Sequence, residues 1–385
     1  MTTTTPTPDA TTEASPEAGA APTAPAILSD ADWSAAWGHE LTDAPQVFGG
    51  LPREAYDQLD GVNASLIKHV ILESEAHAWR KMRDPEREQS KDQGAFLVGN
   101  ITHTCLLEPE LFGKRYLEIP PDAPSRPTAK QLQGPKPRKD GTVNPETKAY
   151  AAWQEAKERQ AWWERFERDN PQAATAQLVP AKELALGRAC GQAVLDHPAI
   201  GAAFAGEFRN LNELTLTWRD PVTGRRMKCR LDALRLMNDR LWVGDLKTAL
   251  CAAPGPDGFA RDAERHGYLL SAAFYLDATF HCREALERLM GLPEGALIGI
   301  ERRFEWIAIE KDCPRPDFVG RYFMNDDQLE AARPVVRQGI DRVVQAEITG
   351  WWPGYDTAAK PLELAAYGYA RLERLALAQR HGFVP

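Results

Sequence analysis

The chain has 385 residues, of which 43% are hydrophobic and 26% are charged, a composition typical of soluble globular proteins. Its formal net charge is −9 at pH 7, which argues against a protein that coats nucleic acid by bulk positive charge. This charge leaves room for an enzyme with a local basic channel. No apolar run approaches the roughly 18–20 residues that a membrane span needs, so we expect no membrane partner.

The first 27 residues are rich in Thr, Pro, Ala and Glu. They lack the basic start and the apolar centre of a signal peptide, so we expect the protein in the cytoplasm. Such a composition buries too little apolar surface to offset the entropy of the chain. Residues 1–27 are therefore predicted to be a disordered tail, followed by a single domain over 28–385.

Six cysteines are scattered along the chain without a Cys-x-x-Cys pair. In a cytoplasmic protein this spacing argues against disulfides, zinc ribbons and iron–sulfur clusters. We interpret the cysteines as small buried hydrophobic residues.

Residues 28–200 are predicted to be mainly helical. Short helices or loops are expected over 30–41 and 51–59, followed by a helix over 63–84 with Asn63 or Ser65 as its cap. The stretch 94–112 predicts a mostly apolar, buried helix that carries one histidine, His103. Further helices are expected over 145–169, capped near Asn144, and over 181–200.

Between the helices, residues 120–145 are rich in Pro, Gly, Lys and Arg and show no periodicity. This composition predicts a mobile basic loop. Its positive side chains either follow the phosphates of a nucleic acid or form an ordinary solvated surface.

From residue 213 the hydrophobic period changes to two, which indicates β-strands. A hairpin is predicted from strands over 213–220 and 226–237, followed by a third strand over 241–248. A long helix over 259–286, a strand over 300–312 and a helix over 323–350 come next. The order of the elements indicates an α/β core with a helical N-terminal cap. The sheet core is expected at 201–325 and C-terminal helices at 326–385.

The predicted strands carry charges where a buried strand would be apolar. Because strand side chains alternate, Lys228, Arg230 and Asp232 share one face of the second strand. Asp245 and Lys247 share a face of the third. If the register places residue 232 near residue 245, two carboxylates and one ammonium group converge at one end of the sheet.

Two such carboxylates repel each other unless a cation lies between them, and oxygen ligands of this kind suit Mg²⁺ or Mn²⁺. The metal would polarise a phosphodiester, while Lys247 would orient or deprotonate the attacking water or stabilise charge on the phosphate. Glu213, at the start of the first strand, could reach the same edge. The alternative is that Asp232 and Asp245 simply form salt bridges with Arg230 and Lys247.

Several motifs, in order along about residues 55–325, resemble the PD-(D/E)xK nuclease superfamily. The resemblance is greatest to the phage and prophage exodeoxyribonuclease VIII type, the RecE-like exonucleases. The motifs are YDQLDGVNASLIKHVILESEAHAW, GNITHTCLLEPELF, ELTLTWRDPVTGRRMKCRLDAL, VGDLKTA, HGYLLSAAFYLDA and FEWIAIEKDCP. A series of ordered motifs is far more specific than Asp-x-Lys alone.

The resemblance implies a fold, an activity and a set of site residues. The fold is the restriction-endonuclease-like mixed sheet flanked by helices, assembled into a homo-oligomeric ring around DNA. The activity is 5′→3′ digestion of one strand at the ends of linear double-stranded DNA, which leaves a 3′ tail for a RecT-like annealing partner in recombination. The implied roles are His103, Asp232 and Asp245 as Mg²⁺ or Mn²⁺ ligands, the carbonyl of Leu246 as a further ligand, Lys247 as the catalytic lysine and Glu213 acting through water.

One position departs from the family's pattern. Ser271 stands where the family usually has a glutamine, four residues before Tyr275 and on the same helix face. Tyr275 either contacts a DNA end or is a core aromatic residue, and a serine is too short to make the glutamine's contacts. Lys228 and Arg230 are the candidates for touching the scissile backbone.

Two other functions remain open on the sequence. The first is an endonuclease or a single-strand-specific nuclease of the same superfamily. The second is a catalytically silent DNA-binding scaffold on the same fold, although such a protein would have no reason to keep His103, Asp232, Asp245 and Lys247 together.

Overall fold

The computed structural model describes residues 27–86, 93–136, 142–205, 211–237, 239–359, 361–362 and 369. All but the last residue of the predicted tail at 1–27 lies outside this part. Residues 137–141 of the basic loop also lie outside it, as do residue 360 and nearly all of the predicted helical region after residue 362.

A mixed sheet forms the centre of the molecule, as predicted. It has six strands in the order β1-β4-β5-β6-β7-β8, of which four were predicted. The pair β6 and β7 is parallel and the other neighbours are antiparallel. The strands are β1 (Gln46–Phe48), β4 (Asn212–Arg219), β5 (Arg226–Met237), β6 (Arg240–Ala249), β7 (Glu301–Glu310) and β8 (Val319–Phe323). The edge strands β1 and β8 were not predicted, because three and five residues are too short to show a reliable period.

The hairpin between β4 and β5 closes as its sequence suggests. The side chain of Asp220 accepts hydrogen bonds from the backbone N–H and the hydroxyl of Thr223. Gly224 then takes a left-handed φ of 71°, which glycine adopts without steric cost. The register that follows pairs Trp218 with Met227 and Leu214 with Leu231.

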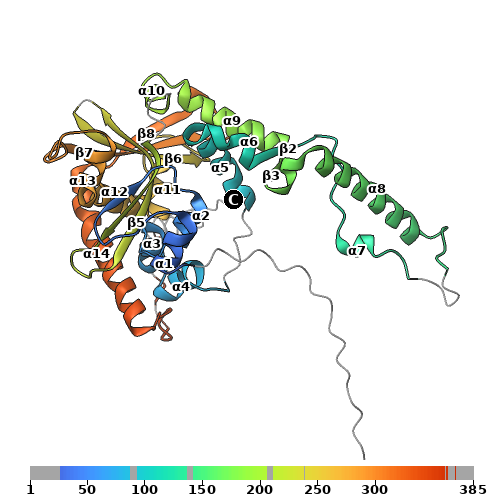
Figure 1. Cartoon of the computed structure of the whole chain (residues 1–385), viewed down its shortest axis with the longest axis horizontal. Helices are drawn as coiled ribbons and strands as arrows, with labels where there is room; N and C mark the ends of the chain where they lie inside the picture. The colour runs from blue at the N-terminus through green and yellow to red at the C-terminus, as the bar shows by residue number, and fades with distance from the viewer. Residues whose placement is uncertain are drawn as a thin grey trace, which may run out of the picture.

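Helices cover both faces of the sheet (Figure 1). On one face lie α3 (Ala64–Leu72), α12 (Tyr268–His281) and α14 (Asp326–Thr349), which share a core with Leu216, Met227 and Phe304 of the strands. On the other face lie α5 (Gln93–Leu107), α9 (Ala181–Leu195) and α10 (Gly201–Phe204), around Trp242 and Ile307. The protein is therefore a three-layer α/β/α structure.

Two of the predicted long helices are interrupted. The helix expected over 63–84 is split into α3 and α4 (Glu75–Met82), because the side chain of Ser74 accepts the N–H of His77 and caps a new helix. Asn63 caps α3, as predicted. The helix expected over 259–286 is three helices, α11 (Phe259–Arg265), α12 and α13 (Arg283–Leu289), with the first break at Gly267, whose φ is 61°.

The helix α8 (Lys148–Asp169) extends away from the sheet beside α7 (Ala129–Leu132) (Figure 1). Its N-cap is Thr147, not the predicted Asn144. The indole N–H groups of Trp153 and Trp163 donate to the carbonyls of Leu132 and Pro124. Two points of the predicted basic loop, Pro124 and Leu132, therefore contact α8, and the mobility of the loop stays a prediction.

The remaining elements are short. They are α1 (Asp30–Trp37), α2 (Arg53–Gln58), α6 (Phe112–Arg115), the 3₁₀ turns Pro109–Leu111, Pro171–Ala174 and Pro316–Phe318, and a separate parallel pair, β2 (Tyr116–Ile119) with β3 (Gln177–Pro180). All six cysteines are free thiols, and three of them are buried. Within the described ranges, no helix has both the length and the apolar character needed to cross a membrane.

Candidate metal centre

The candidate centre lies where β5 leaves β6. The paired register of these strands ends at Ala233 and Gly244. At the next position the carboxylate of Asp232 accepts the backbone N–H of Leu246 through Oδ2, at 2.8 Å. A side chain thus takes the place of a backbone acceptor, and the fork brings Asp232 beside the segment that carries Asp245, as the predicted register requires.

The helix α5 approaches β6 closely because of Gly99. A Cβ atom at this position would lie 3.2 Å from the hydroxyl oxygen of Thr248, closer than most real Cβ contacts. One helical turn later, Nε2 of His103 lies 3.2 Å from the carbonyl oxygen of Leu246. The glycine therefore allows the helix to deliver its histidine to the strand.

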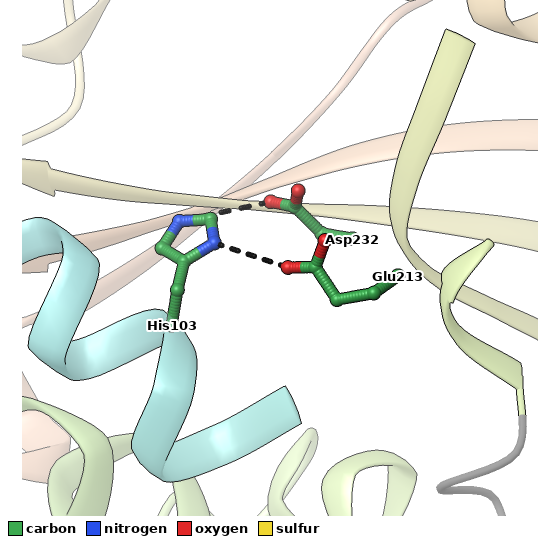
Figure 2. A group of neighbouring side chains, drawn as sticks. All are labelled: His103, Glu213 and Asp232. Carbon is green, nitrogen blue, oxygen red and sulfur yellow. Dashed lines mark ion pairs between the residues drawn. The ribbon is translucent and has the colours of Figure 1, made fainter. Parts of the chain in front are cut away.

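Figure 2 shows His103, Glu213 and Asp232 pointing toward one another from α5, β4 and β5. The Nδ1 atom of His103 lies 3.8 Å from Oε1 of Glu213, and Nε2 lies 3.8 Å from Oδ2 of Asp232. One potential ligand atom from each residue lies within 4.8 Å of the others. Since Nε2 faces both Asp232 and the Leu246 carbonyl, it is the nitrogen placed to bind a metal, while Nδ1 faces Glu213.

Glu213 is held in an unusual backbone conformation. Its φ is 50°, in the left-handed region that non-glycine residues rarely adopt and that is enriched at functional sites. Its carboxylate accepts a hydrogen bond from Nε of Arg230, which also donates to the carbonyl of Leu51. A carboxylate that orients the second nitrogen of a metal-binding histidine is a recurrent supporting arrangement.

The pKa values of the three residues indicate that acidic groups are in excess around His103. Burial and the neighbouring Asp245 raise the pKa of Asp232 to about 6, although His103 acts to lower it. Burial acts to lower the pKa of His103, but Asp232 and Glu213 outweigh it and raise that pKa to about 9. Burial acts to raise the pKa of Glu213, but His103 and Arg230 outweigh it and lower that pKa to about 2.

This donor set fits a hard divalent cation. It offers one imidazole nitrogen, carboxylate oxygens and the backbone carbonyl of Leu246, which suit Mg²⁺ or Mn²⁺. A cation bound to His103 and Asp232 would take the place of the imidazole proton, because metal ligands must be deprotonated. The side chain of His103 is 29% exposed, so the centre is open to a substrate.

Asp245 lies beside this group but is paired differently. Its carboxylate forms an ion pair with Nζ of Lys247, which also donates to the carbonyl of Leu246 at 3.3 Å. Burial acts to lower the pKa of Lys247, but Asp245 and Asp232 outweigh it and raise that pKa. The salt-bridge alternative therefore holds for Asp245 and Lys247, whereas Arg230 pairs with Glu213 instead of Asp232. Metal binding by Asp245 stays a prediction.

Lys228 and Arg230 do not occupy the position expected of residues that touch a DNA backbone. The ammonium group of Lys228 donates to the carbonyls of Tyr56 and Leu59 at 2.7 and 2.6 Å, and the residue is 4% exposed. Arg230 is 9% exposed and is committed to Glu213 and Leu51. The segment over 51–61 covers this part of β5 and satisfies its charges internally. DNA contact by Lys228 and Arg230 stays a prediction, and their burial does not favour it.

Ser271 and Tyr275 both lie on α12, near the core. Ser271 is buried at 9% exposure. Tyr275 is half-buried, with its ring centroid 6.1 Å from that of Phe304 and 6.3 Å from that of Phe274. The structure thus gives Tyr275 the packing of a core aromatic residue.

Two residues near the centre were not predicted from the sequence. The Nζ atom of Lys247 lies 5.3 Å from the ring centroid of Tyr268, at the start of α12. The Nζ atom of Lys68, on α3, lies 5.8 Å from the same centroid. No local signal identifies them, since a lysine and a tyrosine in amphipathic helices have the pattern of ordinary surface and boundary residues.

Residues 63–360 match a family described as a PDDEXK-like domain of unknown function, DUF3799. The chain belongs to this family. The match includes β4–β6, α5 and α12, so the predicted PD-(D/E)xK superfamily and mixed α/β fold are confirmed.

Other comparisons are more distant. The crystal structure of a "Putative exonuclease" from Eubacterium rectale superposes with a TM-score of 0.40 at 15% sequence identity, over 80% of this chain and 92% of that chain. No curated protein matches the chain.

Proposed function

We propose that the protein is a metal-dependent deoxyribonuclease that digests one strand of linear double-stranded DNA in the 5′→3′ direction. The observation that carries the proposal is the convergence of His103, Glu213 and Asp232 at the fork between β5 and β6, next to the Asp245–Lys247 pair. The PDDEXK-like family supports a phosphodiester-cleaving role for this arrangement.

Each residue has a chemical role in this proposal. His103 through Nε2, Asp232, the Leu246 carbonyl and Asp245 would hold Mg²⁺, or Mn²⁺ in its place. The bound ion would polarise the phosphodiester and lower the pKa of a bound water. Lys247 would position that water or stabilise the charge that develops on the phosphate. Glu213 would keep Nδ1 of His103 oriented and protonated.

The biological setting is part of the same proposal. The RecE-like resemblance supports an enzyme that generates 3′ single-stranded tails for a RecT-like annealing protein in the cytoplasm. It also supports a homo-oligomeric ring around the DNA. The protein would thus have two partners, a DNA end as its substrate and the annealing protein that takes over the 3′ tail.

The decisive assay uses linear duplex DNA labelled at its 5′ ends, together with a closed circle of the same sequence. We expect early release of the label from the linear DNA in Mg²⁺, no release in excess chelator, and an intact circle. The Asp245→Asn variant, which keeps the size of the side chain, should lose this activity while its circular dichroism spectrum is unchanged.

Other outcomes would select a different function. Nicked or cut circles would favour an endonuclease, and digestion restricted to unpaired strands would favour a single-strand-specific enzyme. Binding of DNA without cleavage in Mg²⁺ or Mn²⁺ would indicate a silent scaffold. Full turnover in excess chelator would contradict the metal mechanism itself.

A further inference from the structure

Lys68, on α3, places a further ammonium group beside the candidate centre. The residue is half-buried, and in the part of the chain that the structure describes it forms no ion pair with a carboxylate. Its Nζ atom lies 5.8 Å from the ring centroid of Tyr268. A half-buried cation without a counter-charge is costly, so its position calls for an explanation.

The backbone around Gly267 fixes the direction of this side chain. A Cβ atom at Gly267 would lie 3.2 Å from Cδ of Lys68 and 3.0 Å from Cδ1 of Leu72. The aliphatic stem of Lys68 therefore packs directly against the glycine, whose left-handed φ of 61° also starts α12. The next residue along the chain is Tyr268, so the backbone at Gly267 orients both the Lys68 side chain and the Tyr268 ring.

Tyr268 connects Lys68 to the candidate centre. The Nζ atom of Lys247 lies 5.3 Å from the centroid of the same ring. Burial and the charge of Lys247 lower the pKa of Lys68, and Asp245 offsets this only in part. Because the carboxylate of Asp245 is already paired with Lys247, it balances the charge of Lys68 only from a distance.

We propose that Lys68, supported by the Tyr268 ring, binds a second phosphate of the DNA strand, adjacent to the phosphate that is cleaved at the metal centre. An anion there would relieve the repulsion between the two lysines, and DNA supplies phosphates at regular spacing along one strand. Lysine suits this role as a mobile point charge. This inference rests on the proposed function, since it assigns a substrate contact to the same site.

The first experiment measures DNA affinity as a function of salt, with Ca²⁺ in place of Mg²⁺ to limit cleavage. Each phosphate contact contributes about 0.9 to the slope of log K against log salt on B-form DNA. We expect Lys68→Met to make this slope shallower by about one such contact and to weaken binding roughly 10-fold at low salt. Lys68→Arg should restore most of the affinity.

The matched control is Lys81→Met, on the neighbouring helix α4. Lys81 is already paired with Glu73, so its removal changes the net charge equally without removing a free phosphate ligand. Its slope should stay as in the unaltered protein. Methionine retains most of the length of the lysine stem, so Lys68→Met should keep the contact with Gly267.

A second experiment separates phosphate binding from catalysis. Bis(p-nitrophenyl) phosphate carries a single phosphate and has no neighbouring one for Lys68 to bind. Lys68→Met should therefore raise the KM for linear DNA several-fold and leave turnover of the small phosphodiester within about 2-fold. A merely structural role for Lys68 would lower both activities together.

The outcomes distinguish this inference from the proposed function. An unchanged salt slope in Lys68→Met, or an equal change in Lys81→Met, would overturn the second phosphate site while cleavage by the unaltered protein continued. If the protein binds DNA in a Lys68-dependent way but never cleaves it, the nuclease function fails and the phosphate site stands. If no DNA binding is found, both are overturned.

Discussion

Two positions on the same strand, only four residues apart, show how differently a fold can treat a buried charge. Lys228 of β5 is enclosed by the segment at 51–61, where two backbone carbonyls accept its hydrogen bonds. Asp232 lies at the fork with β6, where it accepts one backbone N–H and faces His103. The charge of Lys228 is satisfied by hydrogen bonds within the protein, whereas Asp232 lies close to other acidic groups and is partly exposed to solvent.

Burial of a charge therefore does not by itself mark a functional site. Arg235, farther along β5, is also a buried charge that is satisfied within the protein. It is fully buried and donates hydrogen bonds to the carbonyls of Ala203, Leu211 and Leu234. A functional centre is indicated where like charges converge from separate elements and a cation is required to balance them. Only the Asp232 end of the strand meets this description.

The largest effect should come from Asp232→Asn. The amide keeps the acceptor for the Leu246 N–H but removes the charge that we propose binds the metal. We therefore expect activity to fall by more than the roughly 10–100-fold typical of supporting residues. Stabilisation of the protein by Mn²⁺ in thermal unfolding should also disappear.

Asp220→Asn is the matched control for that variant. Asp220 is buried, and its carboxylate accepts hydrogen bonds from Thr223 and Arg337, away from the centre. It should lower the melting temperature and leave the activity of the folded protein unchanged. Equal loss of activity in both variants would contradict the distinction between the two kinds of buried carboxylate.

Glu213→Gln should have an intermediate effect. It removes the charge that faces Nδ1 of His103 while preserving the size of the side chain, so activity or metal affinity should fall roughly 10–100-fold. Titration of activity with Mn²⁺ would measure the affinity. Glu301→Gln, at the exposed pair with Arg240, should change neither quantity, and a response there would argue against a specific role for Glu213.

Lys228→Met tests the charge that is satisfied by backbone carbonyls. It should lower the stability of the protein without altering catalysis. Loss of the ammonium group leaves the carbonyls of Tyr56 and Leu59 without donors, at a cost of about 1–3 kcal/mol in the free energy of unfolding. Denaturant unfolding measures this cost. A large loss of activity with normal stability would support the prediction that Lys228 contacts DNA.

The same variant has a pH dependence with a defined sign. Burial lowers the pKa of Lys228 from 10.5 to about 7, so between these values the unfolded chain binds more protons than the folded one. The stability that depends on Lys228 therefore rises with pH above about 7. We expect the difference in unfolding free energy between the unaltered protein and Lys228→Met to grow from pH 7 to pH 9, and a shrinking difference would contradict this.

The smallest effect is expected from Ser271→Ala. Ser271 is buried on α12, and alanine fits the same space. Stability should change by less than about 1 kcal/mol and DNA cleavage by less than about 3-fold. A larger loss of cleavage would show that the serine takes part in binding DNA after all.

Much of the fold followed from the sequence because its signals are local. The alternation of β4, β5 and β6 and the long apolar pattern of α5 were sufficient to locate the strands and the histidine helix. The interruptions at Ser74 and Gly267 were missed, since an apolar period continues across them. The short strands β1 and β8 form only because longer strands pair with them. The division of the domain into a mainly helical part, a sheet core and C-terminal helices, with boundaries at residues 200 and 325, stays a prediction.

The sequence predicted which residues make up the candidate site, but it predicted their pairing and orientation less well. His103, Asp232, Asp245 and Lys247 are found together, but Asp245 is paired with Lys247, and Glu213 is held by Arg230. The sequence could not indicate that the segment at 51–61 would cover Lys228. That contact joins residues about 170 positions apart.

The sequence by itself determined which chemical groups are present and which strands and helices carry them, because hydrophobic period and motif spacing are properties of neighbouring residues. Only the tertiary structure decided where β5 separates from β6, which charges are satisfied by backbone carbonyls, and that Lys68 and Tyr268 lie beside Lys247. The physical reason is that the environment of a charged side chain is set by whichever distant segment packs against it, and no local pattern encodes that partner.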